Sequence, residues 1–319
     1  MNGLLDPATL HRRSSPFDLD DEAGYRQWRA GKLARRARSA ADLSVDVDDP
    51  RALSASEREA LLQGCARWNM VVYRSARGGP DKDSARVDCQ QLGQQLGLQR
   101  LDANWLADED GISSIAVSPA SGGRGDFIPY TDRPLKWHTD GYYHPPGQRI
   151  RAMLLHCVRP AASGGVNALL DHELAYIALR DASPRWLRAL MAPDAMTIPG
   201  RVGEAGMARP AQPGPVFSID AQDGTLHMRY TARTRSIEWK NDSATLKAAA
   251  FLERYLTEDN PDMLRLQLAP GMGIVANNVL HDRSAFIDDP ACPRLIYRAR
   301  YLDRVANPAV GVEATWRNG

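Results

Sequence analysis

The stretch Trp137-His138-Thr139-Asp140-Gly141 is the part of the sequence from which both the fold and the chemistry can be approached. It places an imidazole and a carboxylate two residues apart. Alternate side chains of an extended backbone point to the same face, so His138 and Asp140 are expected to lie together on a strand. The chain holds 7 histidines and many aspartates, and this triplet alone would therefore be a weak indication of a metal site.

A second segment, far downstream, strengthens that interpretation. Asn277-Asn278-Val279-Leu280-His281 supplies another imidazole, and Arg294 begins a β-like run that continues to Arg298. A strand pairing across the sheet could bring His281 beside the first two side chains. Two imidazoles and one carboxylate on one face of an octahedron are typical of ferrous sites and leave three positions for exchangeable ligands. The pattern therefore predicts a metal site with an anion-binding arginine behind it.

The other histidines fit a ligand role less well. His144 lies close to the triplet, but the prolines that follow it indicate a turn. His156 lies in an apolar run and is interpreted as a hydrogen-bonded core histidine. His172 stands at a helix start and is interpreted as a surface or capping group, and His227 has no carboxylate at ligand spacing.

The first hundred residues are predicted to be mainly helical. Apolar spacing and capping signals predict a helix through Tyr25, Trp28 and Leu33 capped by Asp20 or Asp21, a helix from Ser54 to Asn69, a helix over residues 89–96 and a strand at residues 70–73. Residues 26–38 form a basic run. We interpret this run as a solvated helix face, with contact to an anionic partner or membrane surface as the alternative.

From Ile112 onward, short β-type segments alternate with turn residues. Strands are predicted at residues 115–117, 127–130, 152–158, 166–170, 216–219, 226–230, 274–279 and 295–301, and the runs 152–158 and 166–170 are predicted to form a hairpin. Further helices are predicted after Asp171, from Ser183-Pro184 and after Ser243. Residues 193–215 are rich in Gly and Pro, which predicts a long loop that is either a mobile lid or a passive connection.

These elements predict an α+β chain in which strands carry the motifs. No internal repeat or linker separates independent domains, so we expect a single domain over residues 1–319. Within it, a mainly helical region at residues 1–105 would pack on a β core with helical insertions at residues 106–305, followed by a tail at residues 306–319.

Composition limits the classes of function. A hydrophobic content of 43% is ordinary for a soluble globular protein, and a net charge of +1 argues against a protein that grips nucleic acid. The four cysteines are widely spaced and are interpreted as reduced thiols, which predicts a cytoplasmic protein. We find no signal peptide and no apolar run of membrane-spanning length.

Taken together, the motifs resemble those of the taurine dioxygenase (TauD/TfdA) family of Fe(II)- and 2-oxoglutarate-dependent oxygenases. The resemblance rests on Trp-His-Thr-Asp-Gly at 137–141, Gly164-Gly165 on a turn, His281, and Arg294-x-x-x-Arg298, and it covers residues from about 110 to 304. It implies a double-stranded β-helix, or jelly roll, with flanking helices and Fe(II) at its open end. It also implies 2-oxoglutarate and O₂ as cosubstrates, with release of succinate and CO₂.

The resemblance also implies roles for single residues. His138, Asp140 and His281 would be the iron ligands, and Arg294 would pair with the far carboxylate of 2-oxoglutarate, because its planar fork matches a carboxylate. The family commonly has Thr shortly after the Gly-Gly turn, whereas this chain has Asn167, whose amide can still donate to the cosubstrate.

The substrate side is less determined. Tyr142, Tyr143 and His144 are expected to edge the pocket of a small-molecule substrate. For Arg298, three roles stay open: binding an anionic group of the substrate, contact with the cosubstrate, or a structural ion pair. Retention of Asp140 favours hydroxylation of an unactivated C–H bond. A metal-dependent hydrolase with the same three ligands and a non-catalytic jelly-roll binding protein are the alternatives, and a homo-oligomer is left open.

Overall fold

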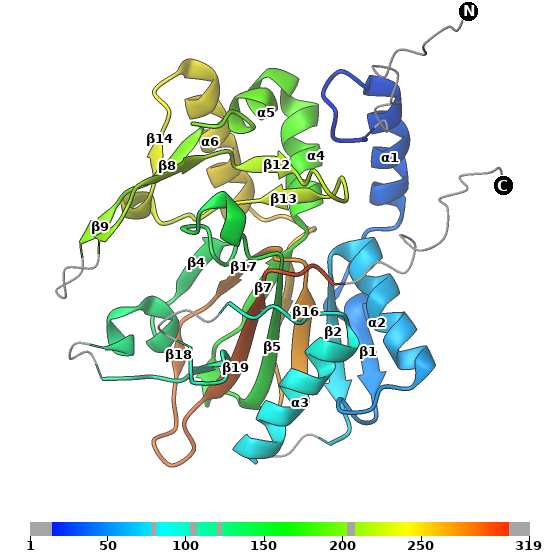
Figure 1. Cartoon of the computed structure of the whole chain (residues 1–319), viewed down its shortest axis with the longest axis vertical. Coiled ribbons are helices and arrows are strands. Elements are labelled where there is room, and N and C mark those ends of the chain that lie inside the picture. The colour runs from blue at the N-terminus through cyan, green and yellow to red at the C-terminus, as the bar shows by residue number, and fades with distance from the viewer. Residues whose placement is uncertain (1–14, 78–80, 103–106, 120–122, 203–207, 306–319) are drawn as a thin grey trace, which may run out of the picture.

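The computed structural model describes residues 15–77, 81–102, 107–119, 123–202 and 208–305 (Figure 1). Helices and strands are mixed along the chain and the strands form several sheets, which confirms the predicted mixed class. Within the described residues, no helix combines the length and the apolar composition that crossing a lipid bilayer would require.

The N-terminal region forms three helices with the predicted caps at two of them. α1 (Glu22–Ala34) begins at Asp21, whose carboxylate accepts from the Gly24 amide at 2.8 Å. α2 (Ala55–Trp68) carries the predicted capping box at Ser54 and ends at Asn69 in the left-handed conformation. α3 (Lys82–Gln95) starts earlier than the predicted helix, because the Asp81 side chain caps it.

The largest sheet has six strands in the order β1, β2, β16, β5, β19, β3. These are β1 (Ser44–Val47), β2 (Met70–Ser75), β16 (Met272–Ala276), β5 (Ala152–Arg159), β19 (Leu295–Tyr301) and β3 (Ser113–Ile115). Only the pair β1 and β2 is parallel. The N-terminal region therefore contributes two strands to the sheet that also holds the C-terminal strand β19.

A second sheet has four antiparallel strands in the order β15, β7, β17, β4. These are β15 (Leu264–Leu266), β7 (Asn167–Leu170), β17 (Leu280–Arg283) and β4 (Leu135–His138). Apolar side chains of both sheets meet in one core, among them Val72, Met153, Ile274 and Ile296 from the large sheet and Leu169 and Leu264 from the small one. The opposite face of the large sheet is covered by α2 and α3 (Figure 1).

A helical cap lies beyond one end of the two sheets (Figure 1). It consists of α4 (His172–Ala182), α5 (Pro184–Leu190), α6 (Ser243–Thr257) and the hairpin of β12 (Phe217–Ile219) and β13 (Leu226–Met228), which share one apolar core. The chain after β13 runs beside the end of β4, where the Thr139 amide donates to the Tyr230 carbonyl at 3.0 Å. The cap is therefore fastened to the strand that carries His138.

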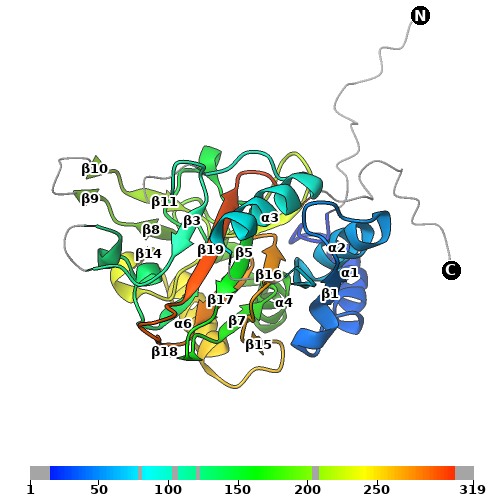
Figure 2. The same ribbon diagram turned by 90° about the horizontal axis from the view of Figure 1, so that it is seen from below.

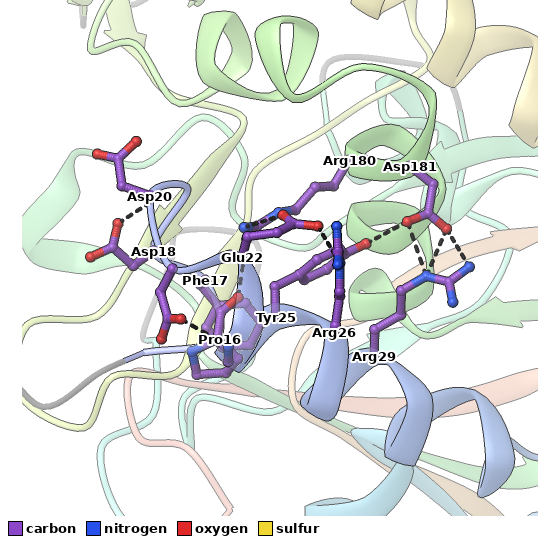
Figure 3. A network of polar contacts seen from close by, with 12 residues as sticks. Pro16, Phe17, Asp18, Asp20, Glu22, Tyr25, Arg26, Arg29, Arg180 and Asp181 are labelled. Carbon is purple, nitrogen blue, oxygen red and sulfur yellow. Dashed lines mark hydrogen bonds and ion pairs between the residues drawn. The ribbon is translucent and has the colours of Figure 1, made fainter.

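α1 is held to α4 by polar contacts (Figure 3). The Tyr25 hydroxyl donates to Asp181 at 2.8 Å, Arg29 pairs with the same carboxylate at 2.6 Å, and the Arg180 cation lies 3.8 Å from the centre of the Tyr25 ring. Lys32 is buried and pairs with Asp171 and Glu173. Part of the basic run is thus internal, which differs from the solvated helix face that we expected.

Three sequence predictions about the β region are wrong. The runs 152–158 and 166–170 form strands, but β5 and β7 belong to different sheets and do not pair as a hairpin. Between them, Gly164 and Gly165 both have positive φ, and β6 (Ser163–Gly164) pairs with β18 (Phe286–Ile287). Residues 127–130 are not a strand: short 3-10 turns cover Arg124–Asp126 and Ile128–Tyr130, the second with a proline in its first turn.

The third error concerns residues 193–215, which were predicted to be a long loop. They contain β8 (Met196–Ile198), β9 (Arg201–Val202), β10 (Ala208–Arg209) and β11 (Gln212–Gly214). β8 pairs with β11 and with β14 (Glu238–Trp239), and β9 pairs with β10. Figure 2 shows β9 and β10 at the opposite end of the molecule from α1 and α2.

Candidate metal centre

Three side chains meet where β4 and β17 lie side by side. His281 is the direct register partner of His138, and their ring centroids are 4.2 Å apart. One possible ligand atom each from His138, Asp140 and His281 lie within 4.8 Å of one another, and all three residues are buried. The expectation that a paired strand brings His281 to the first two residues is therefore confirmed.

Asp140 reaches this group in a different way from the one expected. β4 ends at His138, so Asp140 lies in the turn that follows the strand. Its backbone is held by the Asn278 side chain, which accepts from the Asp140 amide at 2.7 Å and donates to the Asp140 carbonyl at 2.9 Å and the Ile150 carbonyl at 2.7 Å. Asn278 itself has a φ of 50°, a conformation in which Asn is well tolerated.

The hydrogen bonds leave the metal-binding atoms free. The Nδ1–H of His138 donates to the Lys136 carbonyl at 2.9 Å, and that of His281 donates to the Val279 carbonyl at 3.0 Å. A carbonyl can only accept, so in each ring the lone pair is at Nε2. Asp140 Oδ2 is buried and has no hydrogen-bond partner among the described residues. This set of two imidazole nitrogens and one carboxylate oxygen fits a divalent metal ion.

The electrostatics keep His138 and Asp140 in the protonation states that ligands need. Burial, together with the neighbouring His281, lowers the pKa of His138 to about 3. Burial alone would raise the pKa of Asp140, but the cations Arg298 and Arg300 outweigh it and hold that pKa below its usual range. At neutral pH the centre therefore presents a neutral imidazole at His138 and an ionised carboxylate.

Two arginines of β19 face Asp140. Arg298 Nη1 lies 3.3 Å from Asp140 Oδ1, and Arg300 Nη1 lies 4.0 Å from the same oxygen. Arg300 also donates to the Tyr143 hydroxyl at 3.0 Å and pairs with Asp102. Arg300 is a site residue that was not predicted from the sequence. Its alternation with Arg294 and Arg298 was the available signal, because residues two apart on a strand share a face.

Arg294 lies at the other end of that face, before β19 begins. It lines a small cavity together with Asn167, Gly164 and Gly165, and Asn167 and Arg294 are both buried. Its Nη1 has no hydrogen-bond partner among the described residues, and burial lowers its pKa from the ordinary value. A buried guanidinium with a free nitrogen and a nearby amide can receive a carboxylate.

The expected pocket residues lie in the turn after Asp140. Tyr142 and Tyr143 pack edge to face at 5.3 Å, and Tyr143 contacts Arg300. His144 is turned away from the two metal-binding rings: its Nδ1 lies 2.9 Å from the Gln148 carbonyl and its Nε2 4.0 Å from Asp102. The structure thus joins Tyr143 to the centre through Arg300 and leaves His144 outside the group of possible ligands.

Two other histidines can now be placed. His156 is a core histidine, as predicted, with Nδ1 2.7 Å from the Tyr73 hydroxyl. His172 is not a surface or capping group: it is buried, its Nε2 lies 3.1 Å from the Leu226 carbonyl, and Asp171 caps the helix instead.

Comparisons with known proteins agree with this geometry. The family described as "Taurine catabolism dioxygenase TauD, TfdA family" matches residues 31–300. A uridine-5'-phosphate dioxygenase of Amycolatopsis sp is 33% identical over 278 residues, which is 82% of this chain and 97% of that relative. A uridine-5'-phosphate dioxygenase of Streptomyces sp is 30% identical over 211 residues, which is 63% of this chain and 73% of that relative.

Solved structures of iron oxygenases have a similar fold. An asparagine oxygenase in complex with Fe(II), 2S,3S-3-hydroxyasparagine and succinate has a TM-score of 0.55 at 14% identity, over 81% of this chain and 93% of that one. The non-heme iron oxygenase OrfP in complex with Fe and alpha-ketoglutaric acid has a TM-score of 0.55 at 17% identity, over 78% and 80% of the two chains. At such identities the likeness concerns the fold alone.

Proposed function

The chain belongs to the TauD/TfdA family and is a 2-oxoglutarate-dependent non-haem iron dioxygenase that acts on a small-molecule substrate, and we propose that this substrate is a nucleoside 5'-phosphate such as uridine-5'-phosphate. One observation carries the proposal: a relative named for that substrate is 33% identical and matches this chain over 97% of its own length. Because the chain belongs to this family, the two alternatives, a metal-dependent hydrolase and a non-catalytic binding protein, are set aside.

The iron is proposed to be held by His138, Asp140 and His281. This role is supported by the free Nε2 atoms, the unpartnered Asp140 Oδ2 and the burial of the whole group. Iron and 2-oxoglutarate, when bound there, supply with O₂ the oxidising power for a C–H bond, with release of succinate and CO₂. The backbone carbonyls that accept from the two Nδ1–H groups would fix the ring orientations.

Arg294 and Asn167 are proposed to bind the far carboxylate of 2-oxoglutarate. They line the same cavity, and the free Nη1 of Arg294 gives the carboxylate a charged donor. For Arg298, the 3.3 Å contact with Asp140 supports the third of the three roles, a structural ion pair, here with a proposed iron ligand. In that position it would balance the charge of Asp140.

The two facing sheets are proposed to be the halves of the expected jelly roll within one oxygenase domain. The division into residues 1–105, 106–305 and 306–319 is kept for description, although β1 and β2 share the sheet of β19. A cytoplasmic location is proposed because Cys65, Cys89 and Cys157 are buried free thiols.

The substrate proposal is tested by measuring succinate formation by the purified protein with Fe(II), 2-oxoglutarate and O₂. Uridine-5'-phosphate, its dephosphorylated form uridine, and the other common nucleoside 5'-phosphates would be compared with taurine, asparagine and arginine. The proposal expects stimulation by at least one nucleoside 5'-phosphate and little by uridine. Stimulation by an amino acid or a sulfonate alone would overturn it.

A further inference from the structure

The β9–β10 hairpin places two arginines opposite each other. Arg201 and Arg209 are direct register partners in this antiparallel pair, so their side chains share one face of the hairpin. Like charges directly opposite each other destabilise a strand pair. Such an arrangement becomes favourable when an anion lies between or across the two guanidinium groups.

Both arginines lie over aromatic rings instead of carboxylates. The Arg201 cation is 4.8 Å from the centre of the Phe127 ring, and the Arg209 cation is 5.6 Å from that of Tyr143. Arg209 also donates to the Tyr143 carbonyl at 3.3 Å and the Pro199 carbonyl at 2.9 Å. Among the residues that the structure describes, neither arginine has a carboxylate within ion-pair distance.

Among the described residues, this lack of a counter-charge distinguishes the pair from several other arginines around the centre. Arg298 is paired with Asp140, Arg300 with Asp102 and Arg124 with Asp108. Arg283, Arg229 and Arg294 also have no ion pair with a carboxylate among the described residues. Arg283 and Arg229 each donate to three backbone carbonyls, and the proposed role of Arg294 is to receive a carboxylate from a ligand. Burial lowers the pKa of Arg209 from its ordinary value, as expected for a partly desolvated cation without an anion.

Tyr143 connects the hairpin to the metal centre. Its backbone carbonyl and its ring contact Arg209, and its hydroxyl accepts from Arg300 at 3.0 Å. Arg300 in turn lies 4.0 Å from Asp140. Arg209 therefore contacts the same tyrosine that Arg300 contacts, and Arg201 is the register partner of Arg209, so one end of an elongated substrate is expected to lie here.

We propose that Arg201 and Arg209 form a phosphate-binding subsite that holds the phosphate group of the substrate at the mouth of the centre. The inference rests on the proposed function for its ligand, a nucleoside 5'-phosphate. The planar forks of two guanidinium groups present several donors to phosphate oxygens, and the aromatic rings beneath them restrict their orientation. A neutral nucleoside would lose this contact.

The direct test is equilibrium binding to the metal-free protein, measured by calorimetry with uridine-5'-phosphate, uridine and inorganic phosphate. The variants are Arg209→Gln and the double variant Arg201→Gln/Arg209→Gln. Arg185→Gln, an exposed arginine on α5 with the same change of charge, is the control. We expect a loss of about tenfold in affinity for uridine-5'-phosphate per arginine, as for lost hydrogen bonds to charged groups. The wild type should bind uridine as weakly as the double variant binds uridine-5'-phosphate.

Each other outcome overturns the subsite. The subsite is ruled out if the double variant binds uridine-5'-phosphate as tightly as the wild type does. It is also ruled out if Arg298→Gln removes the preference for uridine-5'-phosphate over uridine while the hairpin variants keep that preference. A loss confined to inorganic phosphate would mean that the hairpin binds free anions and not the substrate. Arg209→Lys keeps the charge, and should retain part of the affinity; this variant replaces Arg209→Gln if thermal melting shows that the latter does not fold.

The assay of succinate formation separates the two proposals. If the nucleotide binds through the hairpin but stimulates no succinate, the substrate proposal fails and the subsite stands. If the nucleotide stimulates succinate and the double variant has an unchanged KM for it, the substrate proposal stands and the subsite fails. If both hold, the double variant should raise KM by a larger factor than it lowers kcat.

Discussion

Two antiparallel strand pairs in this molecule each place two identical side chains directly opposite each other. His138 of β4 faces His281 of β17, and Arg201 of β9 faces Arg209 of β10. The histidines are buried, whereas Arg201 is exposed and Arg209 is half-buried. Facing pairs of identical ionisable side chains thus occur both inside the protein and at its edge.

This difference in burial, together with the chemistry of the side chains, determines which ligand each facing pair can bind. A buried histidine can give up its proton, as the lowered pKa of His138 indicates, and then offers a lone pair to a metal ion. An arginine keeps its charge at any accessible pH, so a facing pair of arginines attracts an anion. Burial and the acidity of the group, more than the backbone geometry, determine the ligand.

The largest expected effect is the loss of Fe(II) affinity when one histidine of the facing pair is removed. His281→Ala should reduce Fe(II) affinity more than about 100-fold, since even outer partners of metal ligands contribute 10-fold to 100-fold. Anaerobic titration with Fe(II) measures it, and thermal melting checks the fold. His144→Ala is the control, because this ring lies outside the ligand group and should leave the Fe(II) affinity unchanged. Near-normal Fe(II) affinity in His281→Ala would remove the proposed centre.

The next effect concerns Arg294, a buried arginine whose Nη1 has no hydrogen-bond partner among the described residues. Arg294→Ala should weaken 2-oxoglutarate binding by about 10-fold to 100-fold, because a charged, two-pronged hydrogen-bonding partner is lost. Arg294→Lys should lie between this variant and the wild type. Arg185→Ala, at an exposed arginine on α5, should leave the affinity unchanged. Equal cosubstrate affinities in all four proteins would place the carboxylate elsewhere.

A smaller effect tests how Asn278 positions the Asp140 carboxylate beside the two histidines. Asn278→Gly keeps the positive φ but deletes the amide that holds Asp140, so Fe(II) affinity should fall about tenfold. Asn69→Gly is the comparison, since Asn69 is also buried with a positive φ but its side chain bonds to Asp171 and Asn277 and not to Asp140. Both variants should lose about 1–3 kcal/mol of unfolding free energy. If Fe(II) affinity falls equally in both, Asn278 has no special positioning role.

The smallest effect sharpens the claim that burial keeps histidines neutral. Burial lowers the pKa of His156 to about 4, while the unfolded chain should have a value of about 6.5. Between these values the unfolded state binds a proton that the folded state does not, so stability falls as the pH falls from 6.5 to 4. The slope from this residue is about 1.4 kcal/mol per pH unit. Urea unfolding of wild type and His156→Gln across this range should differ by that slope, and parallel curves would contradict the prediction.

The sequence predicted the centre better than the connections around it. His138 and Asp140 were found because their spacing is local. His281 and Arg294 were found because a further imidazole and an arginine on β-like runs complete the pattern of a ferrous site. Arg300 was missed although a strand was predicted over residues 295–301, because the arginine motif taken from the sequence ended at Arg298. Asn278 lay in the quoted segment, but its contacts with Asp140 join residues far apart in the chain.

The errors in the fold have a common physical cause. The apolar runs of β5 and β7 predict strands, but nothing in such a run states which strand it will pair with. The strands of residues 193–215 are two or three residues long, too short for a period-two pattern. The register of Arg201 and Arg209 is consequently visible only in the folded molecule.

The most direct test of the contrast between the two pairs is a crossed titration. His281→Ala and Arg201→Gln/Arg209→Gln would each be titrated with Fe(II) and, separately, with uridine-5'-phosphate, under anaerobic conditions. We predict that the histidine variant loses Fe(II) binding and keeps nucleotide binding, whereas the arginine variant loses nucleotide binding and keeps Fe(II) binding. Loss of both ligands in either folded variant, or of neither, would contradict the assignment of one ligand to each pair.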